Sequence, residues 1–231
     1  MQVSSKEINK RTIALIGEDK FNALQKSHVV VFGLGGVGSY CATALARAGV
    51  GALTIIDFDL IDASNINRQE FAKVSTVGMP KVDIAEQILL DINPDLKLIK
   101  YQLKVDEGNV SEMLKQADCV IDCIDDVPAK VAISKYCEDH GINHVSCMGT
   151  ALRLDASKFQ FGDIFETSVC PLCKSVRKLA RNAGIQKMNV LYSTEVPLKK
   201  TGEELGSCSF VPPVAGMMLA GYAIKHLASI D

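Results

Sequence analysis

Four glycines between residues 33 and 38 follow an apolar segment at residues 28–32. Three of them fit the pattern G-x-G-x-x-G, in which missing side chains let backbone N–H groups approach a phosphate. A helix beginning directly after the loop would add a favourable dipole for that anion. The sequence therefore predicts a nucleotide-binding loop containing Gly33, Gly35, Gly36 and Gly38.

The residues after the next apolar segment indicate which nucleotide is bound. Asp57 lies 19 residues past Gly38, close to the spacing of a carboxylate that binds ribose hydroxyls. A triphosphate carries more charge than the pyrophosphate of a dinucleotide, and it requires Arg, Lys and usually Mg²⁺ to offset that charge. The sequence supplies such groups in order, at Asp59, Asn65, Arg68, Gln69 and Lys81. We therefore expect ATP with Mg²⁺ rather than NAD.

The glycines and the basic residues could each have a role that involves no ligand. Glycines suit a tight junction between a strand and a helix, whatever the site binds. Arg68 and Lys81 could be solvated surface charges, as most basic residues are. The order of the charged residues after the second apolar segment favours binding.

Composition limits the class of protein. The 231 residues, 48% of them hydrophobic, are enough for one α/β domain. The formal net charge of −2 argues against general electrostatic attraction to nucleic acid. The polar N-terminal residues and eight cysteines, most in apolar segments, favour a reduced cytoplasmic protein. The apolar run at 210–224 is shorter than a membrane span and predicts a buried or dimer-facing helix.

Hydrophobic patterning predicts how the chain is organised. Apolar strands alternate with helices as far as residue 147, which is typical of a Rossmann-like, doubly wound and mainly parallel sheet. The expected strands are 28–32, 53–57, 97–101, 118–122 and 143–147, and the expected helices are 39–48, 79–92, 108–116 and 127–140. Strands at 159–164 and 189–193 are expected to extend this sheet in antiparallel fashion, with a helix at 170–182 between them.

We expect a single domain over residues 1–231. Within it, residues 1–27 would form N-terminal helices and residues 28–150 the nucleotide-binding core. Residues 151–231 would form a substrate-side extension that ends in the terminal helix.

Together these motifs resemble the ThiF/MoeB/HesA superfamily, adenylyltransferases related to ubiquitin-activating enzymes. The matching stretches are 33–39, 53–59, 65–69, 77–81 and 122–125. The resemblance implies that Asp57 holds ribose and that Arg68 and Lys81 contact phosphates. It also implies that Asp125, the second aspartate of Asp-x-x-Asp, lies near Mg²⁺ and the α-phosphate.

The same resemblance implies a role for Arg11, which is similar to an N-terminal arginine that reaches into the partner subunit's site. The homodimer would then be functional. Two alternatives remain at this point. Asp125 could be the N-cap of the following helix, where aspartate is favoured, and Arg11 could be an ordinary charge on a helix surface.

Members that activate a sulfur carrier usually hold zinc with two C-x-x-C pairs. This sequence has one such pair, Cys170 and Cys173, followed by Cys208 alone. A tetrahedral site requires four ligands, so we expect no zinc unless two half-sites meet across a dimer.

The second half of the chain resembles another branch, the tRNA threonylcarbamoyladenosine dehydratases. The stretches are 149–155, 163–167, 170–172, 176–178 and 192–195, and the departures are Ala156 for a common proline and Cys173 for a small residue. The resemblance implies that ATP adenylates the threonyl carboxylate of the modified adenosine beside the anticodon. Intramolecular cyclisation would then release AMP. Whether a sulfur-relay protein assists is left open.

The charges of this region support an anionic substrate. No Asp or Glu occurs from residue 167 to residue 194, and Lys174, Arg177, Lys178 and Arg181 fall on one helical face. Such a stripe could contact tRNA phosphates, although a solvated helix face would look the same.

Three alternatives for the function remain. The first is adenylation of a carrier protein's C-terminal Gly-Gly, as in molybdopterin or thiamine biosynthesis, with Cys170, Cys173 and Cys208 as candidates for a thioester. The second is a nucleotide-sensing scaffold that binds ATP without turnover. The third is an NAD-dependent dehydrogenase, which we rank last because the sequence has no Tyr-x-x-x-Lys pair.

Overall fold

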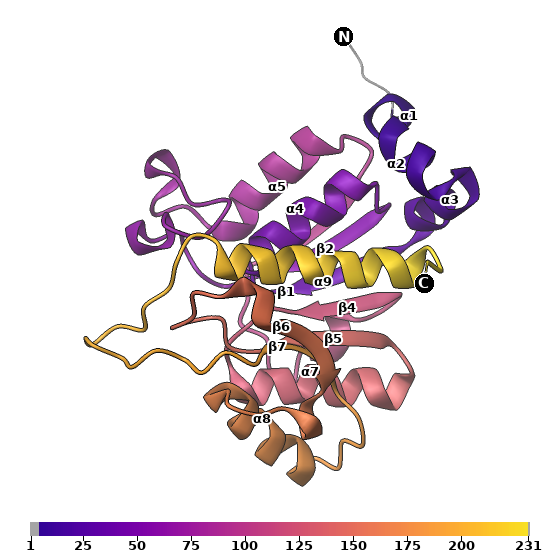
Figure 1. The fold of residues 1–231 in the computed structure, drawn as a ribbon. Helices are drawn as coiled ribbons and strands as arrows, with labels where there is room; N and C mark the ends of the chain where they lie inside the picture. The colour runs from indigo at the N-terminus through magenta and orange to yellow at the C-terminus, as the bar shows by residue number, and fades with distance from the viewer. Residues whose placement is uncertain (1–4, 231) are drawn as a thin grey trace.

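The computed structural model of the chain describes residues 5–230. Its centre is a twisted seven-stranded sheet with the strand order β3-β2-β1-β4-β5-β7-β6 (Figure 1). The strands are β1 (His28–Phe32), β2 (Ala52–Ile56), β3 (Lys97–Tyr101), β4 (Cys119–Asp122), β5 (Asn143–Cys147), β6 (Phe159–Asp163) and β7 (Asn189–Ser193).

The pairing of the strands confirms the predicted mainly parallel sheet with an antiparallel extension. Strands β1 to β5 pair in parallel, with Val30 of β1 opposite Thr54 of β2 and Val120 of β4. Strand β7 also runs parallel to β5, and β6 is the antiparallel edge strand, paired with β7. The sequence predicted that both C-terminal strands would be antiparallel to the rest of the sheet, but only β6 is.

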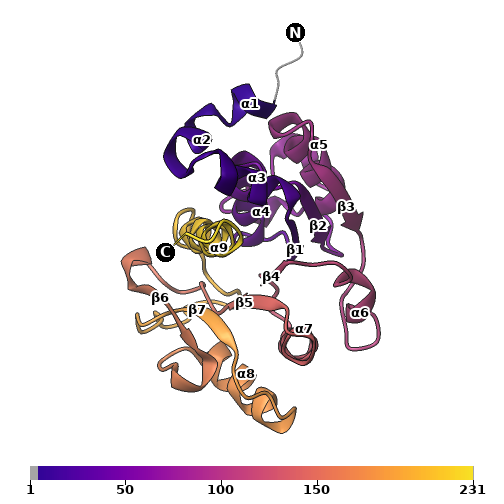
Figure 2. The ribbon, with the colours of Figure 1, turned by 90° about the vertical axis from the view of Figure 1, so that its right-hand side faces the viewer.

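Helices cover both faces of this sheet (Figure 2). Helices α4, α5 and α9 pack on one face, and α6 and α7 pack on the other, with α8 against α7. The helices are α1 (Ser5–Ile8), α2 (Lys10–Ile16), α3 (Glu18–Lys26), α4 (Gly38–Ala48), α5 (Lys81–Ile92), α6 (Val110–Met113), α7 (Val127–His140), α8 (Pro171–Asn182) and α9 (Val211–Leu227).

Helix α6 is much shorter than the predicted helix at 108–116. Its first turn is replaced by a polar turn in which the Asp106 carboxylate accepts the backbone N–H groups of Gly108 and Asn109. At the other end Gln116 has a left-handed backbone, with φ of 67°, which a right-handed helix of L-residues does not accommodate.

Strand β1 shows why a central strand can be apolar at consecutive positions. Val29 and Val31 enter the core beneath α4, α5 and α9, whereas Val30 and Phe32 enter the core beneath α6 and α7. Side chains alternate between the faces of a strand, so a strand covered on both sides needs apolar residues at every position.

The terminal helix α9 contains the apolar run at 210–224 and packs closely on α4. A Cβ atom on Gly216 would lie 2.2 Å from the Val37 carbonyl oxygen, so only glycine permits this approach. Within residues 5–230, no helix combines the length and apolar character that crossing a bilayer requires.

Candidate functional site

A pocket of about 320 Å³ lies at the carboxyl ends of β1, β2 and β4. The strand order reverses at this point. Strands β2 and β3 lie on one side of β1, whereas β4 and β5 lie on its other side. Open α/β sheets bind ligands at such a point. All the predicted nucleotide-site residues line the pocket except Gly38 and Arg11: Gly33, Gly35, Gly36, Asp57, Asp59, Asn65, Arg68, Gln69, Lys81 and Asp125.

The glycines of the loop serve two different purposes. Gly33 has φ of +83°, and a Cβ atom on Gly38 would lie 1.7 Å from the Gly33 carbonyl oxygen, so the strand–helix junction itself requires both. Gly35 meets no such obstacle, since its Cβ atom would approach only the Gln69 side chain, at 3.9 Å. Gly35 lines the pocket, where a missing side chain leaves room for a ligand to reach the backbone.

The Asp57 carboxylate is fixed at the end of β2. Its two oxygens accept the backbone N–H groups of Leu34, at 2.6 Å, and Asp59, at 2.9 Å. Burial raises the pKa of Asp57, and the Lys81 ammonium and these N–H groups oppose that rise. A carboxylate held in this way beside the glycine loop is suited to accept hydrogen bonds from hydroxyl groups.

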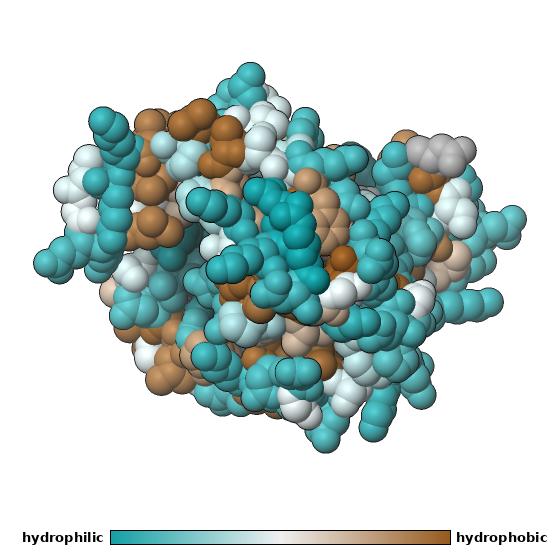
Figure 3. Space-filling view, turned by 90° about the horizontal axis from the view of Figure 1, so that it is seen from below, coloured by the Kyte–Doolittle hydropathy of each residue, from teal (hydrophilic) through white to brown (hydrophobic). Residues whose placement is uncertain are grey.

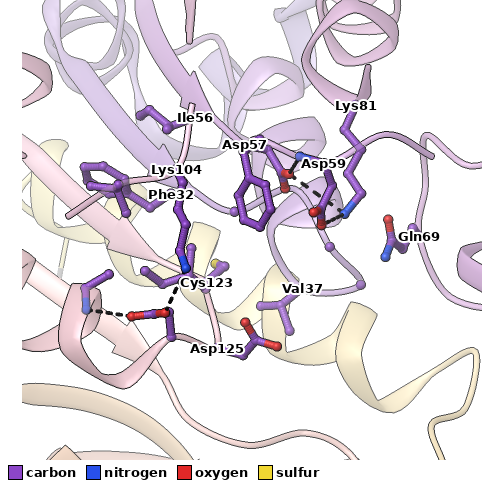
Figure 4. Close-up of a pocket in the computed structure, with 18 of the residues that line it drawn as sticks. Phe32, Val37, Ile56, Asp57, Asp59, Gln69, Lys81, Lys104, Cys123 and Asp125 are labelled. Atoms are coloured by element: carbon purple, nitrogen blue, oxygen red, sulfur yellow. Dashed lines mark hydrogen bonds and ion pairs between the residues drawn. The ribbon is translucent and has the colours of Figure 1, made fainter. Parts of the chain in front are cut away.

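Lys81 begins α5 and extends a buried ammonium towards the same corner. Its Nζ lies 2.7 Å from Asp59 Oδ2 and 3.9 Å from Asp57 Oδ1 (Figure 4). The side chain of Lys81 is only 6% exposed, whereas that of Asp59 is 45% exposed. The pocket therefore holds a positive charge whose position two carboxylates define.

Arg68, Asn65 and Gln69 come from the loop between β2 and α5. The Arg68 guanidinium donates to the Ser64 carbonyl at 3.0 Å and to Asn67 Oδ1 at 2.9 Å. The Asn65 side chain accepts the Asp62 backbone N–H at 3.2 Å, so it also shapes the loop. Gln69 is buried and uncharged. Arg68 is half-buried and supplies the positive charge of this wall.

The structure tests the N-cap reading of Asp125. The N-cap of α7 is the next residue, Asp126, whose carboxylate accepts the Ala129 backbone N–H at 3.0 Å. Lys104 Nζ lies 3.6 Å from that same carboxylate. Asp125 is exposed on the pocket wall, and Figure 4 draws no interaction from it to the other residues shown. The N-cap reading of Asp125 is therefore wrong.

Carboxylates of the pocket fit Mg²⁺ in the way that nucleotide sites usually do. Among the residues that the structure describes, no three His, Cys, Asp or Glu side chains converge as a complete metal site. Magnesium is commonly held by one or two carboxylates together with substrate phosphates and water. Asp125 lines the pocket and is the carboxylate available for this role, because the Asp59 carboxylate is already paired with Lys81 at 2.7 Å.

One end of the pocket is lined by residues that no sequence motif marks. Phe32, Ile56, Leu103, Val105 and Ala129 form an apolar wall there, the natural place for a flat heterocycle. Lys104 and Thr150 also line the pocket. Residues 103–105 follow β3 without regular structure, and no pattern in the sequence marks them.

Arg11 is exposed on α2 and does not line the pocket of its own chain. Its predicted action in a partner subunit stays a prediction.

The predicted basic stripe on α8 is only partly available. Lys174, Lys178 and Arg181 are exposed, and the face on which α8 lies is mainly hydrophilic (Figure 3). Arg177 instead donates to the Thr167 carbonyl at 2.7 Å and to Thr167 Oγ1 at 2.8 Å. Arg181 lies over the Phe165 ring, 5.5 Å from its centroid. Arg177 therefore holds the loop before α8.

A doubly wound sheet with a glycine loop, a ribose-type carboxylate and buried cations at the switch point defines a nucleotide-binding α/β protein. The particular family follows from comparison with known sequences. Residues 9–231 match the model of the ThiF family, and the chain belongs to this family.

One known relative matches almost the whole chain, and another matches a little more than half of it. The tRNA threonylcarbamoyladenosine dehydratase of Bacillus subtilis is 36% identical over 231 residues, which cover 92% of this chain and 91% of the relative. The molybdopterin-synthase adenylyltransferase of Escherichia coli is 36% identical over 137 residues, which cover 59% of this chain and 54% of the relative.

Solved structures agree with these relatives. The crystal structure of E. coli tRNA N6-threonylcarbamoyladenosine dehydratase in complex with AMP superposes with a TM-score of 0.94 at 29% identity, covering 99% of this chain and 98% of that chain. The same enzyme in complex with ATP gives a TM-score of 0.93 at the same identity and coverage.

Proposed function

We propose that this protein is an ATP-dependent tRNA threonylcarbamoyladenosine dehydratase. The observation that carries the proposal is the likeness over the full length of the chain, including residues 151–231, to dehydratases. The match to the molybdopterin-synthase adenylyltransferase covers only 59% of the chain. The dehydratase match therefore spans more of the chain, 92% against 59%, and it favours tRNA as the substrate.

ATP would occupy the pocket between the glycine loop and Lys81. Its base would lie against the apolar wall, its ribose at Asp57, and its phosphates near Gly35, Arg68 and Lys81. Backbone N–H groups, an arginine and a lysine are the donors that stabilise phosphoryl charge in other proteins. Magnesium held at Asp125 would offset further charge on the phosphates.

The reaction uses this site in two steps. The threonyl carboxylate of the modified adenosine attacks the α-phosphorus, and pyrophosphate leaves with its pair of electrons. Arg68 and Lys81 stabilise the charge that develops on the phosphate oxygens. A nitrogen or oxygen of the same side chain then attacks the activated carbonyl, AMP leaves, and a ring is formed with the net loss of water. The second step is intramolecular, so it needs no nucleophile from the enzyme.

The proposed assembly extends beyond one chain. The protein would act in the cytoplasm as a homodimer, with Arg11 of each subunit reaching the other's pocket. Residues 1–231 would form one domain, and Lys174, Lys178 and Arg181 would contact tRNA phosphates. A sulfur-relay protein would be an additional partner.

Mass spectrometry of nucleosides tests this function directly. The protein is incubated with ATP, Mg²⁺ and tRNA from a strain that lacks the activity. We expect an ATP-dependent loss of one water from threonylcarbamoyladenosine. No change in the nucleoside, with AMP released only when a Gly-Gly-ended carrier is added, would instead assign sulfur-carrier activation. Arg68→Ala protein that forms AMP at the normal rate would contradict the role of Arg68.

A further inference from the structure

The pair Cys170 and Cys173 lies at the N-terminus of α8, outside the nucleotide pocket. Cys170 is the N-cap residue, and its carbonyl accepts the N–H of Lys174 at 3.2 Å. Cys173 follows in the first turn of α8, both side chains are buried, and the Cys173 side chain is close enough to act on the Cys170 thiol. Residues three apart on a helix are surface neighbours, and disulfides join Cα atoms about 4.4–6.8 Å apart. The spacing therefore suits an S–S bond within one turn.

The surroundings of Cys170 favour a thiolate. The hydrogen bond from the Cys173 thiol, the Gly149 backbone N–H and the charge of Arg153 hold the pKa of Cys170 below its ordinary value, against the effect of burial. The same hydrogen bond and burial raise the pKa of Cys173. The pair is therefore asymmetric, with one activated sulfur and one protonated partner, as in reactive C-x-x-C motifs.

Arg153 is the charged residue that acts on Cys170, with a smaller effect than the hydrogen bonds. Arg153 is 3% exposed, and its guanidinium donates to the backbone carbonyl groups of Gly149 and Glu195. Its positive charge favours a thiolate at Cys170.

The other cysteines differ from this pair. Burial raises the pKa of each of five other thiols, which disfavours their reactive form: Cys41, Cys119, Cys123, Cys137 and Cys147. Cys208 is half-buried, and its thiol donates to the Arg153 carbonyl at 3.6 Å. Among the described cysteines, Cys170 is the one whose surroundings activate it.

A short connection joins this pair to the nucleotide pocket. Cys170 Sγ lies 3.4 Å from where a Cβ atom on Gly149 would be, and the Gly149 backbone N–H is among the groups that lower the pKa of Cys170. The next residue, Thr150, lines the pocket. A change in the charge or position of Cys170 Sγ therefore acts on backbone that leads directly into the site.

We propose that Cys170 and Cys173 form a reversible dithiol–disulfide pair, oxidised by peroxides, whose state is transmitted to the nucleotide pocket through Gly149 and Thr150. The Cys170 thiolate attacks one oxygen of hydrogen peroxide, the O–O bond breaks, and hydroxide leaves and takes up a proton. The Cys173 sulfur then attacks the sulfenic acid, forms the S–S bond and displaces a second water. The two thiols lose two electrons to the peroxide, and an external dithiol restores them.

Peptide mapping tests the chemistry without any assumption about the function. Cleavage after Lys158 and Lys174 gives a peptide, 159–174, that contains these two cysteines and no others. Reduced protein is treated with equimolar hydrogen peroxide, blocked with N-ethylmaleimide and digested. We expect this peptide to lose two hydrogens and to escape blocking, and to recover both on reduction with dithiothreitol. A peptide 159–174 that carries two maleimide groups, in protein oxidised elsewhere, overturns the proposal.

Substitutions show which sulfur attacks the peroxide and which one resolves the sulfenic acid. In Cys173→Ser protein, which keeps a hydrogen-bond donor at this position, we expect a sulfenic acid at Cys170 that dimedone traps, because the resolving thiol is missing. The matched control, Cys208→Ala, should form the disulfide as the wild type does. Loss of the disulfide in Cys208→Ala protein would mean that Cys208 is the resolving thiol, which contradicts the pairing proposed. The wild-type peptide map stands even if a variant fails to fold.

The effect on the pocket is measured by ATP affinity, and this readout rests on the proposed function. Oxidation removes a charged acceptor from the Gly149 N–H, so we expect affinity to fall by about threefold to tenfold and to recover with dithiothreitol. In the Cys170→Ala/Cys173→Ala variant, peroxide should leave affinity unchanged. If peroxide lowered ATP affinity equally in the variant and the wild type, the effect would come from another residue. The proposed coupling between the Cys170–Cys173 pair and the pocket would then be wrong. Absence of ATP binding before oxidation would contradict the proposed function instead.

Discussion

The ammonium of Lys130 and the carboxylate of Asp122 form an ion pair, 3.0 Å from Nζ to Oδ2, in which neither side chain is exposed. Lys130 also donates to Ser146 Oγ at 3.0 Å and to the Cys147 carbonyl at 2.8 Å. The other Asp122 oxygen accepts the Ile124 backbone N–H at 3.1 Å. One lysine of α7 therefore ties the end of β4 to the end of β5, directly beneath the loop that carries Asp125.

Replacing Lys130 should destabilise the fold strongly. Lys130→Met removes the ammonium and leaves the Asp122 carboxylate buried without its counter-charge. We expect the free energy of unfolding to fall by about 3–5 kcal/mol, measured by urea denaturation. Lys135→Met is a matched control on the same helix, because Lys135 pairs with Asp139 on the surface. The free energy of unfolding of Lys135→Met protein should fall by less than about 1 kcal/mol. Equal losses in the two variants would show that the buried network adds nothing.

Two glycine substitutions should separate folding from binding. A Cβ atom on Gly35 meets only the Gln69 amide at 3.9 Å, so Gly35→Ala should fold normally and bind ATP weakly. A Cβ atom on Gly38 would overlap the Gly33 carbonyl, so Gly38→Ala should unfold at a lower denaturant concentration. Calorimetric titration with ATP and urea denaturation measure the two effects. Normal ATP affinity in Gly35→Ala protein would exclude close backbone contact with the phosphates there.

Lys81 should contribute to the reaction beyond its role in the structure. Lys81→Met removes the buried cation beside Asp57 and Asp59, and we expect the rate of AMP formation to fall by about 10²–10³-fold. Lys97→Met on β3, an exposed lysine outside the pocket, is the control. Circular dichroism and single-turnover release of AMP from tRNA measure folding and rate. A Lys81→Met rate within a factor of two of the control would contradict a phosphate role.

His144 should make stability depend on pH below neutrality. Burial lowers the pKa of His144 to about 4, and Asp122 and Lys130 act on it in opposite directions. The unfolded chain takes up this proton near pH 6.5 and the folded chain near pH 4, so stability falls as the pH drops through that interval. The loss from this residue amounts to about 3 kcal/mol by pH 4.

A substitution of His144 tests this expectation. Its Nε2 has no hydrogen-bond partner among the described residues, so His144→Leu is tolerable at the site and should flatten the pH dependence between pH 4 and 6.5. The exposed His226 provides the control His226→Gln, which should keep the wild-type slope. Urea denaturation at several pH values gives both curves. The same slope in His144→Leu protein would assign the pH dependence to other groups.

The exposed lysines of α8 should affect tRNA binding through salt-dependent contacts. In Lys174→Glu/Lys178→Glu protein we expect weaker tRNA binding and a shallower dependence of log affinity on log salt, by about 2. Lys20→Glu/Lys26→Glu makes the same charge change on α3, which lies far from α8 (Figure 1). The dehydratase rate at saturating tRNA should be unchanged. Equal weakening by both pairs would indicate general charge attraction rather than a site on α8.

Sequence patterns predicted the parts of the site whose position follows from the ends of strands. Gly33, Asp57 and Asp125 each follow an apolar strand, and parallel strands bring such residues to one edge of a sheet. Phe32, Ile56 and Thr150 also lie at or just past strand ends, but in sequence an apolar residue there looks the same as a core residue, and Thr150 carries no charge that marks it. Lys104 lies in a segment without regular structure, so no local pattern places it. The role of Arg177 was hidden for a related reason. Helical spacing placed it with the exposed lysines, but its hydrogen bonds go to Thr167, outside the helix.

Helix α9 has a consequence for synthesis on the ribosome. Pro212 forms part of the pocket wall, and Gly216 lies against the backbone at the start of α4. The glycine loop leaves the exit tunnel long before these residues are translated. Until residues 211–227 emerge and pack on α4, the part of α4 that α9 covers stays exposed and Pro212 is missing from the pocket wall. The pocket is therefore completed only by α9, the helix that follows all seven strands in the chain.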